Sequence, residues 1–342
     1  MTSHEIRLKR FPTGVPSDAD FEMATVTLPA PADGEVLVKN LWMSVDPYMR
    51  GRMTGQNTYV QGFTLGRALE GGAVGRVAGS RHPQLKVGDH VLNQLGWREA
   101  FISNGRGLQV VDASAVPVQA YLGVLGMPGM SAYVGLLRCG EPKAGDTVFV
   151  SGAAGAVGSA ACQIAKIKGC RVVASAGGAD KVAWLRDAAK VDGAFSYRDY
   201  KDAAGLADAI RQHAPDGIDV YFDNVGGDHL EAALQTMKDF GRIVLCGSIS
   251  RYNDTTPPAG PPSLFAATRK RLTLKGFIVS DHRDAQPEFL REMSGWVRDK
   301  KVVWQETVVD GLENAPRAFA GLFTGANTGK MLVRIAPDAA RA

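Results

Sequence analysis

The sequence has few cysteines, no long apolar run and almost no excess of charge of either sign. Its four cysteines, Cys139, Cys162, Cys170 and Cys246, form no C-x-x-C pair, so we expect reduced and mostly buried thiols. No stretch approaches the run of about 18 apolar residues that spans a bilayer, and the N-terminal segment lacks the apolar core of a secretion signal. These absences favour a cytoplasmic protein with no membrane segment.

The charge balance argues against a nucleic-acid partner. The 39 basic and 35 acidic residues leave a net charge of only +4, and Lys and Arg do not gather into an arm or a stripe. Hydrophobic residues make up 45% of the chain and charged residues 22%, which is typical of a globular protein. The 342 residues are enough for two domains.

Motifs for metal-dependent and hydrolytic chemistry are also missing. There is no H-E-x-x-H pair, no cysteine-rich zinc lobe and no G-x-S-x-G elbow. Glu70 has no histidine beside it, so we interpret it as a buried or turn carboxylate. The segment GANTGKM (325–331) imitates a phosphate loop, but Met331 stands where a Ser or Thr must bind magnesium. We therefore expect no metal site.

Two patterns divide the chain and predict two domains. Residues 1 to about 125 contain short strands broken by glycine turns, which suits a small, partly open β-barrel. From residue 146 onward apolar strands alternate with helix-length segments, which predicts an α/β domain with a doubly wound parallel sheet. The tail from residue 304 has the pattern strand, helix, loop, strand, and it could extend the second domain or return to the first. The expected helices of the second domain include 157–168, 179–189 and 227–238.

One glycine-rich turn carries the strongest functional signal. The apolar strand DTVFVSG is followed by Ala153-x-Gly155-x-x-Gly158 and then by a helical run. Such glycines let the backbone approach a pyrophosphate, and the helix N-terminus offers unpaired N–H groups to it. Ala153 replaces the first glycine of the usual fingerprint, and a tight turn with no ligand is the simpler alternative. The βαβ context favours a dinucleotide site.

The residues after the next strand indicate which dinucleotide. A cofactor with a free ribose 2′-hydroxyl needs Asp or Glu there, but the strand CRVVASA ends at Gly177 and Gly178, and Lys181 follows. A cation without a carboxylate favours a 2′-phosphate, and hence NADP over NAD. Two alternatives stay open, because Asp180 could cap the next helix and Lys181 could be a solvated helix residue.

Small polar residues follow two later strands. RIVLCGSISRYN places Ser248 to Asn253 beyond an apolar strand, and YFDNVGG does the same for Asn224. Ligands of open α/β sheets bind beyond the carboxyl ends of strands, so both segments suit a ligand crevice. Asn224 with its glycines could equally form only a turn.

Several segments together resemble one family. AAGAVGSAACQIAKIKGCRVV, YFDNVGG, GRIVLCGSISRYN, MSVDPYMRGRM and GMPGMSAYVGL are similar to the zinc-free medium-chain dehydrogenase/reductases, in the branch of leukotriene B4 12-hydroxydehydrogenase, prostaglandin reductase and the curcumin reductases. The resemblance covers nearly the whole chain. It implies a GroES-like substrate domain (residues 1–125 and 310–342), an NADP-binding Rossmann domain (residues 126–309), a homodimer, and NADPH-dependent reduction of the C=C bond of α,β-unsaturated ketones and aldehydes.

The resemblance also implies a set of NADP(H) contacts. They are the phosphate loop, the 2′-phosphate residues, the loops after three strands, and one residue of the tail: Gly155, Ala156, Val157, Gly158, Gly178, Lys181, Tyr197, Asn224, Cys246, Gly247, Ser248, Ile249, Ser250, Tyr252, Phe277, Ile278, Val279 and Asn327. Met130 and Ser131 could line the nicotinamide pocket, although ordinary core packing suits them nearly as well.

Two tyrosines are the candidate catalytic residues. Hydride transfer to the β-carbon of an enone builds negative charge on the carbonyl oxygen, and without a metal a hydrogen-bond donor must stabilise it. Tyr252 is the first candidate, either as a direct donor or as part of a proton relay, and Tyr48 is the second, as a donor or aromatic wall on the substrate side. A tyrosine is more often a packing residue than a catalyst. The Pro-rich segment 255–263 could rim the substrate site, but a surface connection is the simpler interpretation.

Two other functions remain open from the sequence. A quinone reductase of the same superfamily would have the same cofactor motifs and reduce quinones but not alkenones. A non-catalytic NADP-binding redox sensor would have the nucleotide site without turnover.

Overall fold

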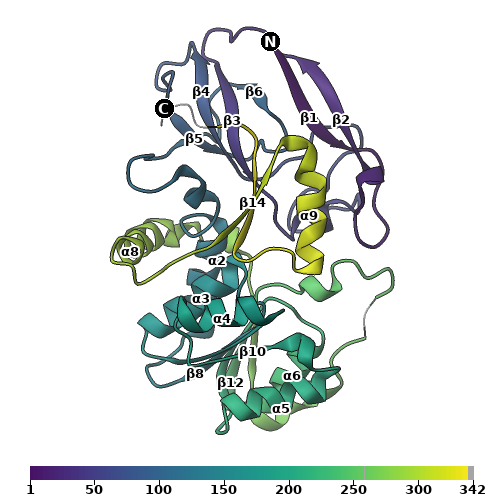
Figure 1. The fold of residues 1–342 in the computed structure, drawn as a ribbon, viewed down its shortest axis with the longest axis vertical. Helices are drawn as coiled ribbons and strands as arrows, with labels where there is room; N and C mark the ends of the chain where they lie inside the picture. The colour runs from purple at the N-terminus through teal and green to yellow at the C-terminus, as the bar shows by residue number, and fades with distance from the viewer. Residues whose placement is uncertain (258, 338–342) are drawn as a thin grey trace. The chain divides into compact units, whose positions relative to one another are not determined.

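The computed structural model describes residues 1–257 and 259–337 (Figure 1). Pro258 of the expected Pro-rich loop and residues 338–342 of the expected first-domain tail lie outside the described residues. The chain divides into two compact units. The first consists of Met1–Leu122, Glu306–Asn327 and Met331–Ala342, and the second of Gly123–Gln305 and Thr328–Lys330.

The tail returns to the first unit except for three residues. Strand β14 (Glu306–Asp310), helix α9 (Ala315–Thr324) and strand β15 (Lys330–Arg334) follow one another, and both strands join the sheet of the first unit. Thr328–Lys330 instead belong to the second unit, where the Gly329 amide donates to the Ala154 carbonyl at 2.7 Å. This division differs by a few residues from the expected boundaries after residue 125 and before residue 310. At the second boundary, β14 begins at Glu306 and pairs with the sheet of the first unit.

The first unit is built from antiparallel strands. Its larger sheet has the order β14-β15-β3-β4-β5-β7, with β6 paired to β3, and a two-stranded sheet joins β1 to β2. Along β2, Phe21 is buried, and from Met23 to Thr27 exposed and half-buried residues alternate, as expected for a strand with one face toward a core. The bounds are β1 Thr2–Leu8, β2 Phe21–Thr27, β3 Val36–Ser44, β4 Ala73–Ser80, β5 His90–Asn93, β6 Ala100–Ser103 and β7 Gln109–Val110, with a short helix α1 at Met49–Arg52.

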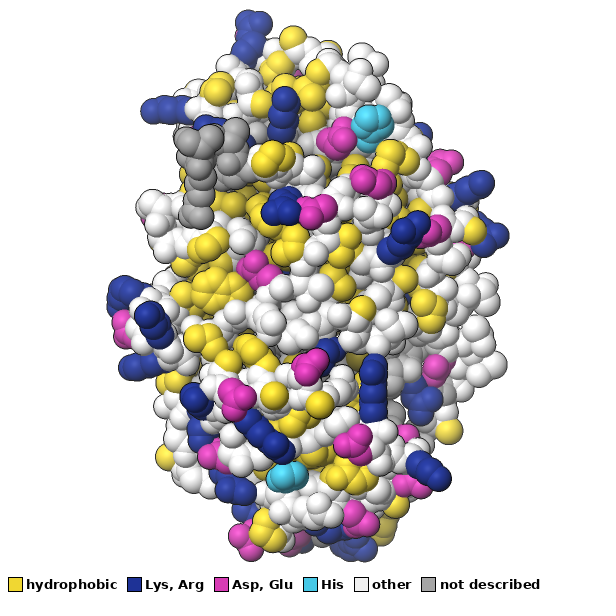
Figure 2. Space-filling view, viewed as in Figure 1, with side chains coloured by type: hydrophobic (Ala, Val, Ile, Leu, Met, Phe, Trp, Pro, Cys, Tyr) yellow, Lys and Arg dark blue, Asp and Glu magenta, His cyan; other side chains and the backbone are white. Residues whose placement is uncertain are grey.

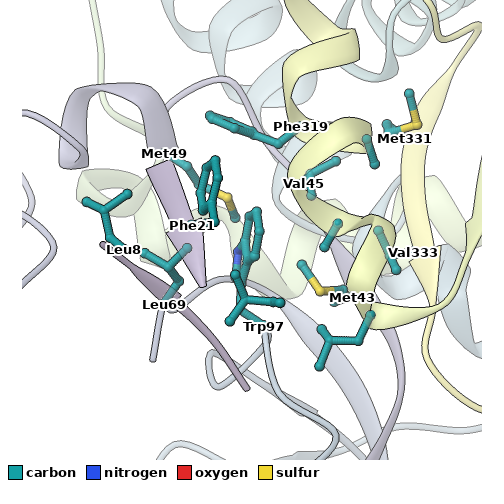
Figure 3. Close-up of a cluster of buried hydrophobic side chains, with 14 of the residues drawn as sticks. Leu8, Phe21, Met43, Val45, Met49, Leu69, Trp97, Phe319, Met331 and Val333 are labelled. Atoms are coloured by element: carbon teal, nitrogen blue, oxygen red, sulfur yellow. The ribbon is translucent and has the colours of Figure 1, made fainter. Parts of the chain in front are cut away.

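An aromatic and methionine-rich cluster forms a core of this unit (Figure 3). Trp97 is fully buried, its ring is stacked on Phe21 with centroids 6.0 Å apart, and it meets Phe319 of α9 edge-on at 6.2 Å. Met331 and Val333 of β15 belong to the same cluster. Burial of each such side chain contributes roughly 1.5–3 kcal/mol. These contacts explain why the tail returns to the N-terminal strands.

The second unit has the predicted doubly wound parallel sheet, in the order β10-β9-β8-β11-β12-β13. The chain proceeds outward from β8 in one direction and from β11 in the other, so the order reverses between these two strands. Ligands of such sheets bind at the carboxyl ends beside this switch point. The strands are β8 Thr147–Val150, β9 Arg171–Ala176, β10 Gly193–Ser196, β11 Ile218–Asp223, β12 Met237–Leu245 and β13 Thr273–Gly276.

Helices connect the parallel strands. The three helices expected at 157–168, 179–189 and 227–238 are confirmed as α3, α4 and α6, with ends that shift by at most two residues. A π-helical turn, Gly135–Gly140, continues α2. The helices are α2 Met127–Val134, α3 Ala156–Ile167, α4 Ala179–Asp187, α5 Ala203–His213, α6 Asp228–Thr236, α7 Ala266–Lys270 and α8 Gln286–Arg298.

Charges of both signs are interspersed on the visible surface. Figure 2 shows Lys and Arg side chains among Asp and Glu, with no broad area of one sign on that face. Among the residues that the structure describes, no helix is both long and apolar enough to cross a bilayer. Across the same residues, no three His, Cys, Asp or Glu side chains are grouped in a way that could hold a metal ion.

Candidate functional site

The glycine-rich turn joins β8 to α3 beside the switch point. Gly152 has the left-handed backbone conformation (φ +58°), which favours glycine, and Gly155 is the N-cap of α3. A Cβ on Gly158 would lie 2.4 Å from the Gly152 carbonyl oxygen and 2.7 Å from the Ala153 Cα. Glycine is therefore required at Gly158 so that helix and loop can pack.

Ala153 does not disturb this turn. Its φ is not positive, its side chain is fully buried, and its amide donates to the Ser175 carbonyl at 2.9 Å. The fingerprint's first position thus tolerates a methyl group, because the left-handed conformation falls on Gly152 one residue earlier. The imperfect match seen in the sequence has this local explanation.

The first turn of α3 suits a pyrophosphate. No side chain caps the helix and no acidic residue stands in its first turn. The amides of Ala156, Val157 and Gly158 come before the first helical donor, because the first bond to the N-cap carbonyl is made by the Ser159 amide (2.9 Å to Gly155). Together with the helix dipole they provide a backbone anion site, so the residues present fit the expected phosphate group.

The end of β9 carries the predicted 2′-phosphate residues. Gly178 is the N-cap of α4 with φ +116°, so Asp180 lies inside the helix and is not its cap. A Cβ on the neighbouring Gly177 would lie 2.9 Å from the Tyr197 hydroxyl oxygen, which places that hydroxyl at the glycine turn. Lys181 is half-buried in the first turn of α4. The structure therefore brings Gly178, Lys181 and Tyr197 together around one turn.

Arg198 is a residue of this region that the sequence reasoning missed. Burial lowers the pKa of Lys181, and the positive charge of Arg198 lowers it further. The two residues come from different elements, so only the pairing of β10 with β9 brings them near each other. The sequence offered one signal, since Arg198 directly follows the predicted contact Tyr197.

A buried carboxylate at the end of β11 accepts hydrogen bonds from the amides of the loop that follows this strand. Asp223 is 1% exposed, and its Oδ1 accepts hydrogen bonds from the Val225 amide (2.9 Å), the Gly226 amide (2.8 Å) and the Tyr221 hydroxyl (2.7 Å). Burial raises the pKa of Asp223, while these hydrogen bonds oppose the shift. Sequence reasoning missed Asp223 and Tyr221, because an isolated acid at the end of an apolar strand gives no motif.

Asn224 is bonded toward the phosphate-loop strand. Its Nδ2 donates to the Ser151 carbonyl at 2.7 Å, and its amide donates to the Ser151 hydroxyl oxygen at 3.1 Å. The side chain therefore ties the loop after β11 to the end of β8 and does more than complete a turn. This lies at the switch point of the sheet.

The loop after β12 is joined to the loop after β11. The amides of Cys246 and Gly247 donate to the Asp223 carbonyl at 2.9 and 3.0 Å, and the Ser250 hydroxyl donates to the Val225 carbonyl at 2.6 Å. The other predicted contacts of this loop, Ser248 and Ile249, are half-buried. Burial raises the pKa of the Cys246 thiol to about 12, so this sulfur is protonated at neutral pH.

Tyr252 turns its hydroxyl back onto the loop after β12. The Ser248 amide donates to the Tyr252 hydroxyl oxygen at 3.3 Å, and a Cβ on Gly247 would lie 3.1 Å from that oxygen. The tyrosine is half-buried. Its hydroxyl is thus placed beyond the carboxyl end of β12, where a ligand of the crevice would lie.

The predicted segment Phe277, Ile278 and Val279 directly follows β13, and all three residues are half-buried. The Phe277 ring packs at Gly135, where a Cβ would lie 2.7 Å from its Cζ. Ser131 is 6% exposed and its hydroxyl donates to the Met127 carbonyl at 2.9 Å, a core-packing arrangement.

The remaining predicted residues belong to the first unit. Tyr48 directly precedes α1 and packs against the aromatic cluster, and burial together with the nearby Asp46 raises the pKa of its phenol. Asn327 is the last residue before the Thr328–Lys330 segment that pairs in the second unit. Glu70 is half-exposed and forms an ion pair with Arg52 at 2.7 Å. Of the two expected settings, a buried site or a turn, the buried one is therefore wrong.

Comparison with known proteins places the chain in a family. Residues 4–111 match the N-terminal domain of oxidoreductase, and residues 156–295 match the zinc-binding dehydrogenase family. The chain is 41% identical to the NADP⁺-dependent 2-alkenal reductase of Nicotiana tabacum over 99% of both chains, and 43% identical to prostaglandin reductase 1 of Bos taurus over 96% of this chain and 97% of that one.

A solved structure gives the same result for the fold. CurA from Vibrio vulnificus in complex with NADPH has a TM-score of 0.92 and 38% identity, covering 98% of this chain and 100% of the other. The similarity extends over both units and over the predicted motifs. The chain therefore belongs to the zinc-free medium-chain dehydrogenase/reductases, in the branch of the prostaglandin and alkenal reductases.

Proposed function

We propose that this chain is an NADPH-dependent reductase of the C=C bond in α,β-unsaturated ketones and aldehydes. The observation that carries the proposal is the carboxyl edge of the parallel sheet, where the backbone phosphate site at α3 and the Gly177–Gly178 turn with Lys181 and Tyr197 follow neighbouring strands, and β9 ends in glycine and not in an acid. Two relatives over 40% identical along nearly the whole chain are named NADP⁺-dependent 2-alkenal reductase and prostaglandin reductase 1. NADPH, when bound, supplies the hydride.

The residues of the second unit divide the binding of this cofactor among them. The first-turn amides of α3 hold the pyrophosphate, Gly178, Lys181 and Tyr197 bind the 2′-phosphate end, and the loops after β11, β12 and β13 surround the nicotinamide half. Asn327 is proposed as a further contact from the tail. The buried Asp223 holds the loops after β11 and β12 in a fixed arrangement, which pre-organises this half of the crevice.

Tyr252 is proposed as the donor that stabilises the carbonyl oxygen. As hydride reaches the β-carbon, negative charge grows on that oxygen, and a phenol with its proton in place can donate a hydrogen bond to it. The Ser248 amide fixes the position of the phenol oxygen. Tyr48 is proposed as a second donor or an aromatic wall on the substrate side, and its raised pKa keeps its phenol protonated at neutral pH.

One panel of substrates tests the proposed reaction against its alternatives. The purified chain is mixed with NADPH and with enones, enals or quinones, and the nicotinamide absorbance is followed. We expect oxidation of NADPH with enones and enals, and saturated ketones or aldehydes as products. Activity on quinones alone would favour a quinone reductase. Absence of turnover with every compound, in a protein that still binds NADPH, would favour a redox sensor.

We also propose a homodimer and a cytoplasmic location. The dimer proposal is supported by the edge strand β13, whose residues are mostly exposed, and by the exposed Leu264 and Phe265 (50% and 75%) shortly before it in the chain. Light scattering after gel filtration tests the dimer, and Phe265→Asp is expected to yield monomers.

The proposed cytoplasmic location is supported by the free cysteines, and fractionation of cells that express the chain tests it.

A further inference from the structure

Two cations, Lys181 and Arg198, follow the carboxyl ends of the neighbouring strands β9 and β10. The strands are parallel and Ser196 pairs with Ala176, so the residues that follow each strand emerge side by side. Tyr197 follows β10 and its hydroxyl reaches Gly177, which follows β9. Arg198 is the next residue after Tyr197, in a short 3₁₀ turn, and its guanidinium is exposed.

The charges of Lys181 and Arg198 act on each other. The positive charge of Arg198 lowers the pKa of the half-buried Lys181, which means that the two like charges repel. A bound dianion would attract both cations at this glycine turn. A phosphate carries about two negative charges and three acceptor oxygens, and a guanidinium can bind two of these at once.

Resting on the proposed NADP-dependent function, we propose that Arg198 is a second cationic contact of the adenosine 2′-phosphate, beside Lys181. The guanidinium supplies a planar pair of donors and the ammonium supplies a point charge, so the two side chains are not redundant. Arg198 therefore contributes to the choice of NADPH over NADH and leaves the rest of the nucleotide unaffected.

Binding of adenosine fragments tests this role without catalysis. The affinities of 2′,5′-ADP and 5′-AMP are measured by calorimetry for the wild type, Arg198→Met and Lys181→Met. Arg211→Met serves as control, because Arg211 is an exposed arginine of α5 that forms an ion pair with Asp208 at 2.6 Å on the same helix. We expect Arg198→Met to weaken 2′,5′-ADP about tenfold and to leave 5′-AMP unchanged, with a loss that shrinks at high salt. The control is expected to match the wild type.

The outcomes separate this inference from the proposed function. If the wild type prefers 2′,5′-ADP but Arg198→Met binds it equally well, or loses both fragments equally, Arg198 has no such role and the NADP assignment stands. If the wild type itself does not prefer 2′,5′-ADP, the NADP assignment and this inference both fail. The reductase reaction is tested separately by the substrate panel.

A different observation concerns a ring that packs against Tyr197. His229, in the first turn of α6, is 5% exposed, and its Nε2 is buried without a hydrogen-bond partner in the described part of the chain. Its ring meets the Tyr197 ring edge-on, with centroids 5.3 Å apart and planes at 75°. A buried nitrogen without a hydrogen-bond partner lowers the stability of the fold. The favourable contribution that the structure shows for His229 is the packing of its ring against Tyr197.

We infer that His229 is a positioning residue that keeps the Tyr197 ring against Gly177. The variants His229→Ala and His229→Phe are compared, since alanine removes the ring and phenylalanine keeps it without the unpaired nitrogen. We expect alanine to weaken 2′,5′-ADP about fivefold while 5′-AMP binding stays constant, and phenylalanine to restore the wild-type ratio. Thermal unfolding checks that each variant folds, and His229→Leu replaces the alanine variant if that one does not.

The ratio of the two affinities decides the question. An alanine variant that retains the ratio of 2′,5′-ADP to 5′-AMP affinity would contradict the positioning role, as would a phenylalanine variant that loses it. In a Tyr197→Phe background, removal of His229 should no longer change the ratio, because the hydroxyl that it positions is gone. A change of the usual size in that background would also contradict the inference.

Discussion

The phosphate loop and the loops after β11 and β12 line the same crevice but are built in different ways. The phosphate loop presents backbone amides, and its shape depends on residues with no side chain, Gly152, Gly155 and Gly158. The other two loops meet at Asp223: its buried carboxylate accepts the Val225 and Gly226 amides of the loop after β11, and its backbone carbonyl accepts the Cys246 and Gly247 amides of the loop after β12. The backbone-built phosphate loop requires that three positions carry no side chain. The side-chain-built loops require that one residue, Asp223, keeps its hydrogen bonds.

The first prediction concerns the phosphate loop, and it adds a single methyl group at Gly158. Gly158→Ala places a Cβ 2.4 Å from the Gly152 carbonyl oxygen, so the phosphate loop must move. We expect NADPH affinity to fall about a hundredfold or more, measured by quenching of protein fluorescence. Gly295→Ala in α8 is the control, since its Cβ meets nothing closer than 3.8 Å. That variant should bind NADPH normally and gain about 0.5–1 kcal/mol of stability.

The second prediction concerns the chemistry beside the side-chain-built region. Tyr252→Phe removes the proposed donor to the carbonyl oxygen but keeps the ring. We expect kcat for an enone to fall about 10²–10³-fold while the Kd for NADPH changes little. Stopped-flow measurement of single turnovers isolates the hydride step. If the variant keeps the wild-type kcat, the charge on the carbonyl oxygen is stabilised by another group, and Tyr48→Phe becomes the decisive variant.

The third prediction tests how far the side-chain-built region depends on Asp223. Asp223→Ala removes the acceptor of the Val225 and Gly226 amides and one of the two acceptors of the Tyr221 hydroxyl, whose other acceptor is the Ser151 hydroxyl oxygen. We expect the free energy of unfolding in urea to fall by about 3 kcal/mol, because each unsatisfied buried group costs roughly 1–3 kcal/mol and some will find water. Asp223→Asn keeps an acceptor oxygen and should lose less than half as much. Equal losses in the two variants would show that charge, and not the hydrogen-bond geometry, holds the loops.

The contrast also explains what the sequence could predict. The phosphate loop, the parallel sheet and helices α3, α4 and α6 follow from glycine spacing and local hydrophobic patterns, and the structure has them within two residues. Arg198 and His229 could not be found this way, because the order of the strands brings their partners near, and Asp223 was missed because an acid at the end of an apolar strand forms no motif. Glu70 was misjudged for the same reason, since its partner Arg52 is distant in sequence and carries no motif with it.

The first unit was the harder one to read. Its strands are short and its core depends on Trp97, which has a left-handed backbone (φ +62°) that no local signal predicts. The sequence pattern of the tail allowed it to join either unit. In the structure Phe319, Met331 and Val333 belong to the same buried cluster as Trp97, and this packing places the tail in the first unit. Packing between a few large side chains that are distant in the sequence determines where the tail lies. Local sequence patterns carry no information about such contacts.

The last and smallest effect is a pH dependence located at His229. Burial lowers the pKa of His229 to about 4, against about 6.5 in an unfolded chain. Between these values the unfolded chain binds a proton that the folded chain does not, so the stabilising contribution is complete above pH 6.5 and is lost as the pH falls toward 4. From pH 7 to 5 the loss from this residue is expected to be about 2 kcal/mol.

His229→Phe isolates this contribution from the other titrating groups. Urea unfolding of the variant and of the wild type is compared at each pH, and the difference between the two free energies is plotted. The variant should be at least as stable at pH 7, because the unpaired Nε2 is gone, and its advantage should grow by about 2 kcal/mol at pH 5. A constant difference across this range would mean that the ring opens to water before it titrates. Helix α6 beside the Asp223 loop would then open to solvent locally while the rest of the protein stays folded.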